Sequence, residues 1–451
     1  MIPSPGHPGW GYYYGAEHSR NRPGGPVSLT EGRKIMGYSQ DTICVQGGWQ
    51  PKNGEPRVLP IYQSTTFKYA TSEEMGKLFD LEEEGYFYSR LQNPTNDVVA
   101  QKICDLEGGV AAMLTSSGQA ATMLAVTNIC EAGDHVVCAA KVYGGTSNLL
   151  AVTLKRFGIE TTLVDQDAPA EELEKAFQPN TKAVFAETIS NPAGVVLDID
   201  KFVKLAHEHG VPMICDNTFA TPINCRPFEW GADIVTHSTT KYMDGHATCV
   251  GGAIVDSGNF DWAAHADKFP GLTTPDETYH GIVYTEKFGK AAYITKATSQ
   301  LMRDLGSIPS PQNSFILNLG LETLPLRVER HCENALAAAK YLQAHEKVAW
   351  VSCPMLEGDK HYALAKKYMP NGTCGVITFG LKGGREEAVR MMDSLKMIAI
   401  VTHVADARSC VLHPASHTHR QMNDQELKEA GVQPDLIRFS VGIENIDDII
   451  A

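Results

Sequence analysis

The chain has 451 residues, enough for two or three domains, and with 43% hydrophobic and 20% charged residues its composition is typical of a globular protein. The formal net charge of -14 argues against a nucleic-acid partner, because phosphate binding requires clustered Lys and Arg. The 11 cysteines are odd in number and never spaced C-x-x-C, which argues against a disulfide framework. Without an apolar run long enough to span a membrane, and without a recognisable secretory signal, the sequence predicts a soluble cytoplasmic protein.

The beginning of the chain differs in composition from the rest. Residues 1–36 are rich in Pro, Gly and Tyr and show neither helical nor strand periodicity, so we interpret them as a poorly ordered leader. Met36 is then a candidate start of the functional chain. We assign residues 37–96 to an N-terminal arm.

From about residue 97 to 256, short apolar runs with β-branched residues alternate with helical patterns. One helical pattern covers residues 199–209 and is followed by Gly210, a common stop signal. Strands separated by helices predict a parallel sheet with helices on both faces, and ligands of such sheets bind beyond the carboxyl ends of the strands. The predicted strands are residues 110–114, 135–139, 160–164, 183–186, 211–215 and 233–236.

A second, smaller domain is expected in the C-terminal part. A segment rich in Pro, Gly, Asp and Thr covers residues 257–285, and longer helical patterns follow at 285–305 and 311–343. A mixed segment continues from residue 348 to Ala451. We therefore predict an α/β protein whose large domain covers residues 97–290 and whose small α+β domain covers residues 291–451.

Lys241 is the main candidate for chemistry. It follows the last predicted strand of the large domain, after the small hydroxyl residues Ser238 and Thr240. Burial behind a strand end lowers the pKa of a lysine and makes its amine nucleophilic toward an aldehyde. The two hydroxyl groups are suited to hydrogen-bonding a phosphate. Taken alone, an exposed lysine after a strand is the more common explanation.

Residues after four other predicted strands favour a role for Lys241 in ligand binding over the more common explanation. Asp216 can pair with a protonated ring nitrogen, although an N-cap is its alternative role. Gly118 and Gln119 open a predicted helix, whose free N–H groups can hold a phosphate. Tyr143 can stack on a ring, and Asn191 can reach a ring oxygen. Together these residues fit one ligand that needs a lysine, a carboxylate, a phosphate cradle and a stacking partner.

The sequence resembles the Cys/Met-metabolism enzymes that depend on pyridoxal 5′-phosphate (PLP). The resemblance runs from about Asp41 to the C-terminus and implies fold type I, as in aspartate aminotransferase. Relatives continue through a last helix beyond the position where this chain ends, so we expect a shortened C-terminus. The motifs that carry the resemblance are Tyr88-Ser-Arg90-Leu-Gln-Asn-Pro-Thr, Ser116-Ser-Gly-Gln-Ala, Asp216-Asn-Thr-Phe-Ala-Thr-Pro, Ser238-Thr-Thr-Lys241, His413-Pro-Ala-Ser and Arg438-Phe-Ser-Val-Gly-Ile-Glu.

The resemblance implies a role for each candidate residue. Lys241 would hold PLP in a Schiff base and act as general acid and base, with Tyr143 stacked on the ring as a second catalytic residue. Arg438 would bind the substrate α-carboxylate with its planar fork. Tyr88 and Arg90 would reach the phosphate in a neighbouring subunit, with Tyr88 also near the substrate, which implies a homotetramer of tight dimers. The remaining cofactor contacts would be Asp216 with the ring nitrogen, Asn191 with the ring hydroxyl, and Gly118, Gln119, Ser238 and Thr240 with the phosphate.

Within the family, three features resemble the sulfhydrylases that act on O-acetylhomoserine. These are Gln119, the motif Tyr143-Gly-Gly-Thr, and the long segment of residues 256–284. Methionine γ-lyases commonly carry Cys at the position of Gly145. The implied reaction is a γ-replacement that converts O-acetyl-L-homoserine and sulfide to L-homocysteine and acetate. The alternatives are a methionine or cystathionine γ-lyase, an O-acetylserine sulfhydrylase, and a protein that keeps the fold only to bind a ligand.

Histidines near the C-terminus raise two further questions. His403 occupies a position near the substrate carboxylate where relatives tend to have Asn or Ser, so we assign it to substrate binding. His413, His417 and His419 have the spacing H-x-x-x-H-x-H, without a neighbouring Cys or carboxylate. Because the resembling family uses no metal, we predict none here.

Overall fold

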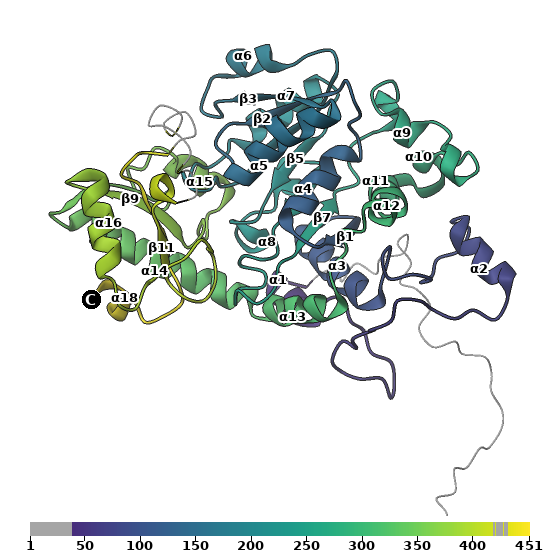
Figure 1. The fold of residues 1–451 in the computed structure, drawn as a ribbon, viewed down its shortest axis with the longest axis horizontal. Coiled ribbons are helices and arrows are strands. Elements are labelled where there is room, and N and C mark those ends of the chain that lie inside the picture. Colours follow the sequence, from purple (N-terminus) through teal and green to yellow (C-terminus); the bar gives the residue numbers. More distant parts are fainter. Residues whose placement is uncertain (1–37, 418–419, 421–426, 428–431) are drawn as a thin grey trace, which may run out of the picture.

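The computed structural model describes residues 38–417, 420, 427 and 432–451 of the chain, which form two sheets and the helices around them (Figure 1). The predicted leader of residues 1–36 lies outside these described residues, as does His419. A seven-stranded sheet forms the large domain and a five-stranded sheet the small domain, so the predicted combination of a large, mostly parallel sheet with a smaller second domain is confirmed.

The large sheet is mostly parallel. Its strand order is β1-β7-β6-β5-β4-β2-β3, and β3, β2, β4, β5 and β6 pair in parallel. Strand β7 runs antiparallel to both of its neighbours, β1 and β6. The strands are β1 (Ala111–Thr115), β2 (His135–Ala139), β3 (Glu160–Val164), β4 (Thr181–Glu187), β5 (Met213–Asp216), β6 (Ile234–His237) and β7 (Gly252–Asp256).

The six predicted strands are confirmed, each to within two residues. Strands β2 and β6 are buried along their whole length, as in a parallel sheet covered by other elements, whereas β3 at the edge of the sheet is only partly buried. Strand β7 is an addition that the sequence pattern did not reveal. The helices of this part are α3 (Pro94–Glu107), α4 (Gly118–Thr127), α5 (Gly144–Asn148), α6 (Ala170–Leu173), α7 (Ile199–Glu208) and α8 (Thr221–Asn224).

The helical patterns after residue 257 are divided more finely than expected. The pattern at residues 311–343 forms two helices that meet near Thr323, because Pro325 lies in the first turn of the second and lacks the N–H that a continuous helix requires. The pattern at residues 285–305 is likewise interrupted by short turns of other helix types. The helices are α9 (Pro270–Thr273), α10 (Tyr284–Phe288), α11 (Ala292–Lys296), α12 (Arg303–Leu305), α13 (Pro311–Glu322) and α14 (Leu324–Ala344).

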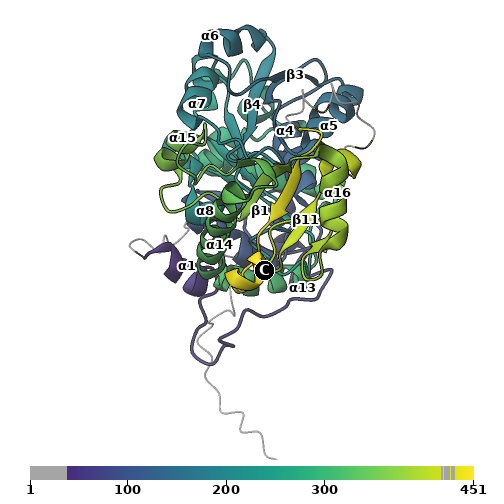
Figure 2. The same ribbon diagram turned by 90° about the vertical axis from the view of Figure 1, so that its left-hand side faces the viewer.

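The small domain is built on a sheet of order β10-β11-β12-β9-β8. All its pairs are antiparallel except β10 with β11. Figure 2 shows this domain from its own side, with α14 and α16 flanking β11. The elements are β8 (Val348–Ser352), α15 (Tyr362–Tyr368), β9 (Val376–Leu381), α16 (Gly384–Ser394), β10 (Ala399–Ile400), β11 (Cys410–Leu412), β12 (Ile437–Ser440) and α18 (Ile446–Ile450).

Two hydrophobic cores meet within α14. Its residues up to Cys332 pack into the core of the large sheet, and those from Ala335 pack into the core of the small sheet. Strand β12 contributes Ile437 and Phe439 to the second core. Because side chains alternate along a strand, Arg438 points to the other face. The domain limits of residues 97–290 and 291–451 remain predictions.

The N-terminal arm contains two short helices, α1 (Gln40–Gln46) and α2 (Ser72–Phe79). Helix α1 packs against α3, α13 and α14, whereas α2 stands at the edge of the molecule in Figure 1. Among the described residues, no helix combines the length and the apolar composition needed to cross a membrane.

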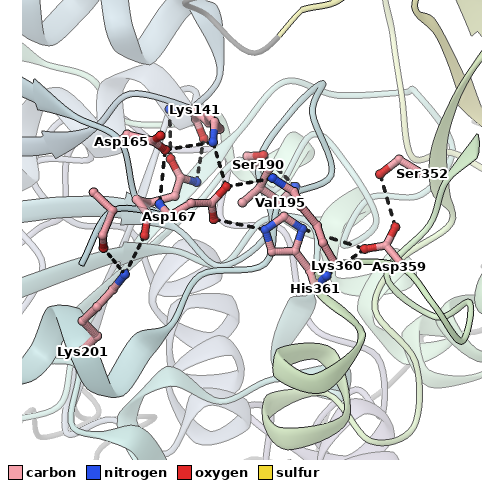
Figure 3. A network of polar contacts seen from close by, with 12 residues as sticks. Lys141, Asp165, Asp167, Ser190, Val195, Lys201, Ser352, Asp359, Lys360 and His361 are labelled. Atoms are coloured by element: carbon pink, nitrogen blue, oxygen red, sulfur yellow. Dashed lines mark hydrogen bonds and ion pairs between the residues drawn. The ribbon is translucent and has the colours of Figure 1, made fainter. Parts of the chain in front are cut away.

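A network of ion pairs and hydrogen bonds joins the two domains (Figure 3). Asp167 follows β3 and accepts hydrogen bonds from Lys141 of the large domain at 2.9 Å and from Lys360 of the small domain at 2.9 Å. His361, at the start of α15, contacts the same carboxylate at 3.1 Å. The side chain of Gln166 accepts from and donates to the backbone of Lys141, so the loop that carries Asp167 is fixed to the end of β2.

Candidate active site

A cavity of about 230 Å³ lies at the carboxyl ends of the parallel strands, where the small domain covers them. Residues that are far apart in the sequence meet there because each follows a different strand of one sheet. The cavity brings together nine of the predicted site residues, namely Gly118, Gln119, Tyr143, Asn191, Asp216, Ser238, Thr240, Lys241 and Arg438.

Lys241 follows β6 and lines this cavity. Burial lowers the pKa of its ammonium group to about 8, and the positive charge of Arg438 acts in the same direction. About a tenth of this lysine is therefore a neutral amine at pH 7, far more than for an ordinary exposed lysine. Such an amine can attack an aldehyde or accept a proton from carbon.

Asp216 ends β5 and also lines the cavity. Its Oδ1 atom accepts a hydrogen bond from the backbone N–H of Thr218 at 2.9 Å. Burial raises the pKa of this carboxyl group, while the interaction with His237 acts against that rise. A buried carboxylate of this kind is stabilised by a cation placed beside it, such as a protonated pyridine nitrogen.

The N-terminus of α4 forms one end of the cavity. Ser117 is the N-cap and accepts from the N–H of Ala120 at 3.0 Å. A Cβ atom on Gly118 would lie 2.5 Å from Cβ of Ser238, so glycine is required for this close approach. The free N–H groups and the helix dipole of α4 thus face Ser238, an arrangement that suits a phosphate.

The other polar side chains at this end of the cavity differ in whether they already have hydrogen-bond partners. The hydroxyl of Thr240 donates to the carbonyl of Gly251 at 3.2 Å and accepts from its N–H at 3.0 Å. The Oε1 atom of Gln119 is buried and has no hydrogen-bond partner among the described residues. An orphaned polar atom beside a helix N-terminus is consistent with a site shaped for a polar ligand.

Tyr143 lines the cavity beside Gln119. It precedes α5, and its side chain is 49% exposed, so the ring is free to stack on a ligand. Gly145 lies against this ring and against the side chain of Gln119. A Cβ atom at position 145 would come within 2.5 Å of Cε1 of Tyr143 and would overlap Nε2 of Gln119. The glycine therefore leaves room for both side chains.

Arg438 is the contribution of the small domain. It is only 5% exposed, and its guanidinium donates to Oδ1 of Asn191 at 3.3 Å and to the backbone carbonyls of Thr402 and His403, each at 3.1 Å. Burial lowers the pKa of Arg438. These contacts fix a buried cation across the cavity from Lys241, where a carboxylate can bind.

Two predicted site residues lie in a different place. Tyr88 and Arg90 line a second cavity of about 750 Å³, formed by the N-terminal arm and residues 278–303. The guanidinium of Arg90 lies over the ring of Tyr88, 5.1 Å from its centroid. Within one chain, neither residue lines the cavity of Lys241.

His403 reaches the site through its backbone. Its carbonyl oxygen accepts from Arg438, but its side chain is not among those that line the cavity. The imidazole instead lies near Asp406, with Nε2 at 3.6 Å from Oδ2. Burial lowers the pKa of His403, as does the charge of Lys241. No group of His, Cys, Asp or Glu arranged to hold a metal ion occurs among the described residues.

Sequence reasoning missed Glu187, which ends β4 and lines the cavity. It also missed a buried pair beneath Asp216, in which Nε2 of His237 lies 2.7 Å from Oε1 of Glu107. Glu187 carries the same signal as Asp216, an acidic residue at the end of an apolar strand. That signal was available in the sequence, whereas the pairing of His237 with Glu107 required the fold.

An α/β protein with a buried lysine, a carboxylate and a phosphate cradle at its strand ends is a PLP-dependent enzyme of fold type I. A sequence model of the family described as "Cys/Met metabolism PLP-dependent enzyme" matches residues 41–451. The chain belongs to this family, and the residues of the cavity fit its cofactor.

Three similar proteins illustrate the relationship. A homocysteine/cysteine synthase from Saccharomyces cerevisiae is 48% identical, over 91% of this chain and 96% of its own. An O-acetyl-L-homoserine sulfhydrylase from Leptospira meyeri is 45% identical, over 92% of this chain and 95% of its own. A crystal structure from Campylobacter jejuni, described as an O-acetylhomoserine (thiol)-lyase with a pyridoxyl-lysine phosphate, superposes with a TM-score of 0.89 at 37% identity, over 92% of this chain and 98% of that one.

Proposed function

We propose that the protein converts O-acetyl-L-homoserine and sulfide to L-homocysteine and acetate by γ-replacement. The names of the yeast and Leptospira relatives support this reaction, and the cavity supplies the groups that it needs. One observation carries the proposal furthest. A lysine of lowered pKa and a buried arginine face the same small cavity from two domains, which suits an amino acid held by its carboxylate while protons move at its carbon atoms.

Each residue has a distinct task in this proposal. Arg438 binds the α-carboxylate, and its own contact with Asn191 orients its fork. PLP, when bound, supplies the electron sink that makes the α-proton acidic. Lys241 removes the α-proton, gives that proton up, and as a free amine again removes a β-proton, which allows acetate to leave from the γ-carbon; it returns protons after sulfide has added. Asp216 keeps the ring nitrogen protonated.

The space beside Tyr143 supports replacement of the leaving group rather than its simple loss. Gly145 lies against the side chains of Gln119 and Tyr143, which both line the cavity, so the two sequence features that resemble sulfhydrylases lie side by side at one wall. This wall has no thiol of its own. Sulfide can therefore approach the γ-carbon without competition from a cysteine side chain.

We also propose that the active enzyme is an oligomer, a tetramer of tight dimers in the cytoplasm. Tyr88 and Arg90 line the large cavity of the arm and not the cavity of Lys241 of the same chain. An exposed pair of a tyrosine and an arginine can complete a phosphate site on a second copy of this chain.

A second reaction is supported by the name of the yeast relative, which includes cysteine synthase. O-acetyl-L-serine is one carbon shorter than O-acetylhomoserine, and Arg438 and Lys241 would hold its amino-acid end in the same way. This β-replacement would give L-cysteine and acetate.

The test supplies purified protein and PLP with each acyl donor and sulfide, and identifies the products by mass. We expect homocysteine from O-acetylhomoserine and no ammonia when sulfide is omitted. If methionine alone yields 2-oxobutanoate and O-acetylhomoserine gives no homocysteine, the protein is a γ-lyase. Borohydride reduction and peptide mapping should place the pyridoxyl group on Lys241. A protein that binds PLP and alters none of these substrates would contradict both enzyme hypotheses, the sulfhydrylase and the γ-lyase.

A further inference from the structure

Glu187 is a buried carboxyl group with an unusual pair of partners. It is 5% exposed, ends β4 and lines the cavity of Lys241. Its Oε1 atom accepts from the backbone N–H of Tyr143 at 2.6 Å, and its Oε2 atom accepts from the backbone N–H of Asn191 at 3.1 Å. One side chain thus joins two loops that follow neighbouring strands, β2 and β4.

Those two loops carry residues proposed above to contact the cofactor ring. Tyr143 would lie on its face, and Asn191 would reach its edge while also accepting from Arg438. A backbone N–H that is held at a fixed point restricts the position of the side chain on the same residue. Both oxygens of Glu187 are used, so their hydrogen bonds fix the spacing between the two loops.

Glu187 also has a second carboxyl group as its neighbour. The register of β4 and β5 places Glu187 directly opposite Asp216. Burial raises the pKa of Glu187 well above its usual range, and the negative charge of Asp216 raises it further. The cations that face the pair are Lys241 and Arg438, which line the same cavity. The backbone N–H groups of Tyr143 and Asn191 act against that rise, because they donate to the ionised form of Glu187.

We propose that Glu187 is a positioning residue, which sets the angle of the cofactor ring by holding the backbones of Tyr143 and Asn191 at a fixed separation. The proposal rests on the cofactor placement of the proposed function. It also explains why a carboxyl group stands where an apolar residue would otherwise continue the strand. A carboxyl group is the side chain that offers two acceptor atoms at this spacing.

The test compares Glu187→Gln with a matched variant, Asp256→Asn. Gln has nearly the same shape but presents a donor to one of the two N–H groups, so one hydrogen bond is lost. Asp256 is a buried strand-end carboxyl group, 1% exposed, that accepts from the N–H of Gly258 at 2.8 Å. It lies at the opposite end of the strands from Lys241, because β7 runs antiparallel to β6 and therefore ends where β6 begins.

We expect Glu187→Gln to bind PLP about tenfold more weakly, which corresponds to the loss of one buried hydrogen bond. The circular dichroism of the visible PLP band should change as well, because it reports the orientation of the ring. Asp256→Asn should leave both quantities unchanged, although it lowers the thermal stability of the protein without PLP. Glu187→Asp, whose shorter side chain cannot reach both N–H groups, should resemble Glu187→Gln.

A purely structural role for Glu187 predicts a different result. In that case both variants lower the thermal stability of the PLP-free protein, and neither alters the dichroism or the PLP affinity of the folded fraction. That outcome overturns the inference while leaving the proposed function intact. If the unmodified protein itself places no PLP on Lys241, the proposed function fails first.

Discussion

The two cavities of this molecule differ in size and in the charges that they hold. The cavity of Lys241 has about 230 Å³ and buries a lysine, an arginine and two carboxyl groups. The cavity of the N-terminal arm has about 750 Å³, is lined largely by aromatic and apolar side chains, and holds Tyr88 and Arg90. The smaller cavity is the candidate active site, because convergent strand ends and groups with altered pKa values locate chemistry better than volume does.

The difference also indicates what each cavity lacks. The smaller one contains the proposed lysine, ring partner and phosphate cradle within a single chain. The larger one presents polar groups that have no role in its own chain's site. The comparison therefore predicts that one chain's large cavity serves the small cavity of another copy.

The prediction with the largest expected effect tests whether Arg90 of one chain completes the active site of another chain. Lys241→Ala and Arg90→Ala should each abolish or strongly reduce homocysteine formation, the first because the amine is lost and the second because the partner's phosphate site is incomplete. When the two variants are co-expressed, a mixed dimer contains one site with both changes and one with neither. Activity should return to about a quarter of the original, because half of the dimers are mixed and each has one intact site.

The controls are the two variants expressed alone and then mixed after folding. If co-expression gives only the average of the separate activities, Arg90 does not act across subunits. Lys296→Met is a matched control for the lysine, since Lys296 is also buried (8% exposed) but donates to the carbonyl of Asn128, away from the site. It should retain PLP and activity.

The part of the site that the sequence predicted follows from the topology of a parallel sheet. Residues after different strands converge at one edge, so Lys241, Asp216 and Tyr143 could be grouped without knowing any distance. The strand limits were accurate because apolar runs bounded by polar residues give a clear pattern even when they are short. Strand β7 escaped notice because pairing direction leaves no mark in a short apolar run.

The remainder depends on contacts between distant residues. The small sheet is mostly antiparallel and assembled from segments as far apart as β9 and β12, so the sequence indicated only a mixed segment. His403 was predicted to bind substrate, which stays a prediction, but only the fold reveals that its backbone carbonyl accepts a hydrogen bond from Arg438. Glu187 could have been identified from its place at a strand end, but its two N–H partners appear only when β2 and β4 are neighbours.

The next prediction concerns the charges of the smaller cavity. PLP capture by the cofactor-free protein should speed up as the pH rises through about 8, because only the neutral amine of Lys241 attacks an aldehyde. Burial and Arg438 both lower the pKa of Lys241, so Arg438→Gln should shift the midpoint to higher pH and slow capture several-fold at neutral pH. Stopped-flow absorbance measures the rate.

Arg408→Gln is the matched control for that charge. Arg408 also belongs to the small domain, but its side chain is 68% exposed and pairs with Asp406. Its removal should leave the pH midpoint of PLP capture where it was. An unchanged midpoint in Arg438→Gln would show that burial alone determines the pKa of Lys241.

The smallest expected effect concerns the polar network that holds the small domain over the active cavity (Figure 3). Burial acts to raise the pKa of Asp167, but hydrogen bonds from Lys141, Lys360 and His361 outweigh it and hold the pKa well below its usual range. Asp167→Asn should weaken the attachment of the small domain by about 1 kcal/mol, because these groups are partly exposed and screened by solvent.

Because the small domain carries Arg438 and the large domain carries PLP, this loss should raise the KM for O-acetylhomoserine by about fivefold and leave the PLP affinity unchanged. Glu160→Gln is the control, since its ion pair with Lys155 is exposed and lies within the large domain. Added salt should reduce the difference between Asp167→Asn and the original protein, because screening weakens the same contacts. If Asp167→Asn lowers PLP affinity and substrate affinity equally, the network stabilises the large domain itself. The active cavity would then not depend on how firmly the small domain is held.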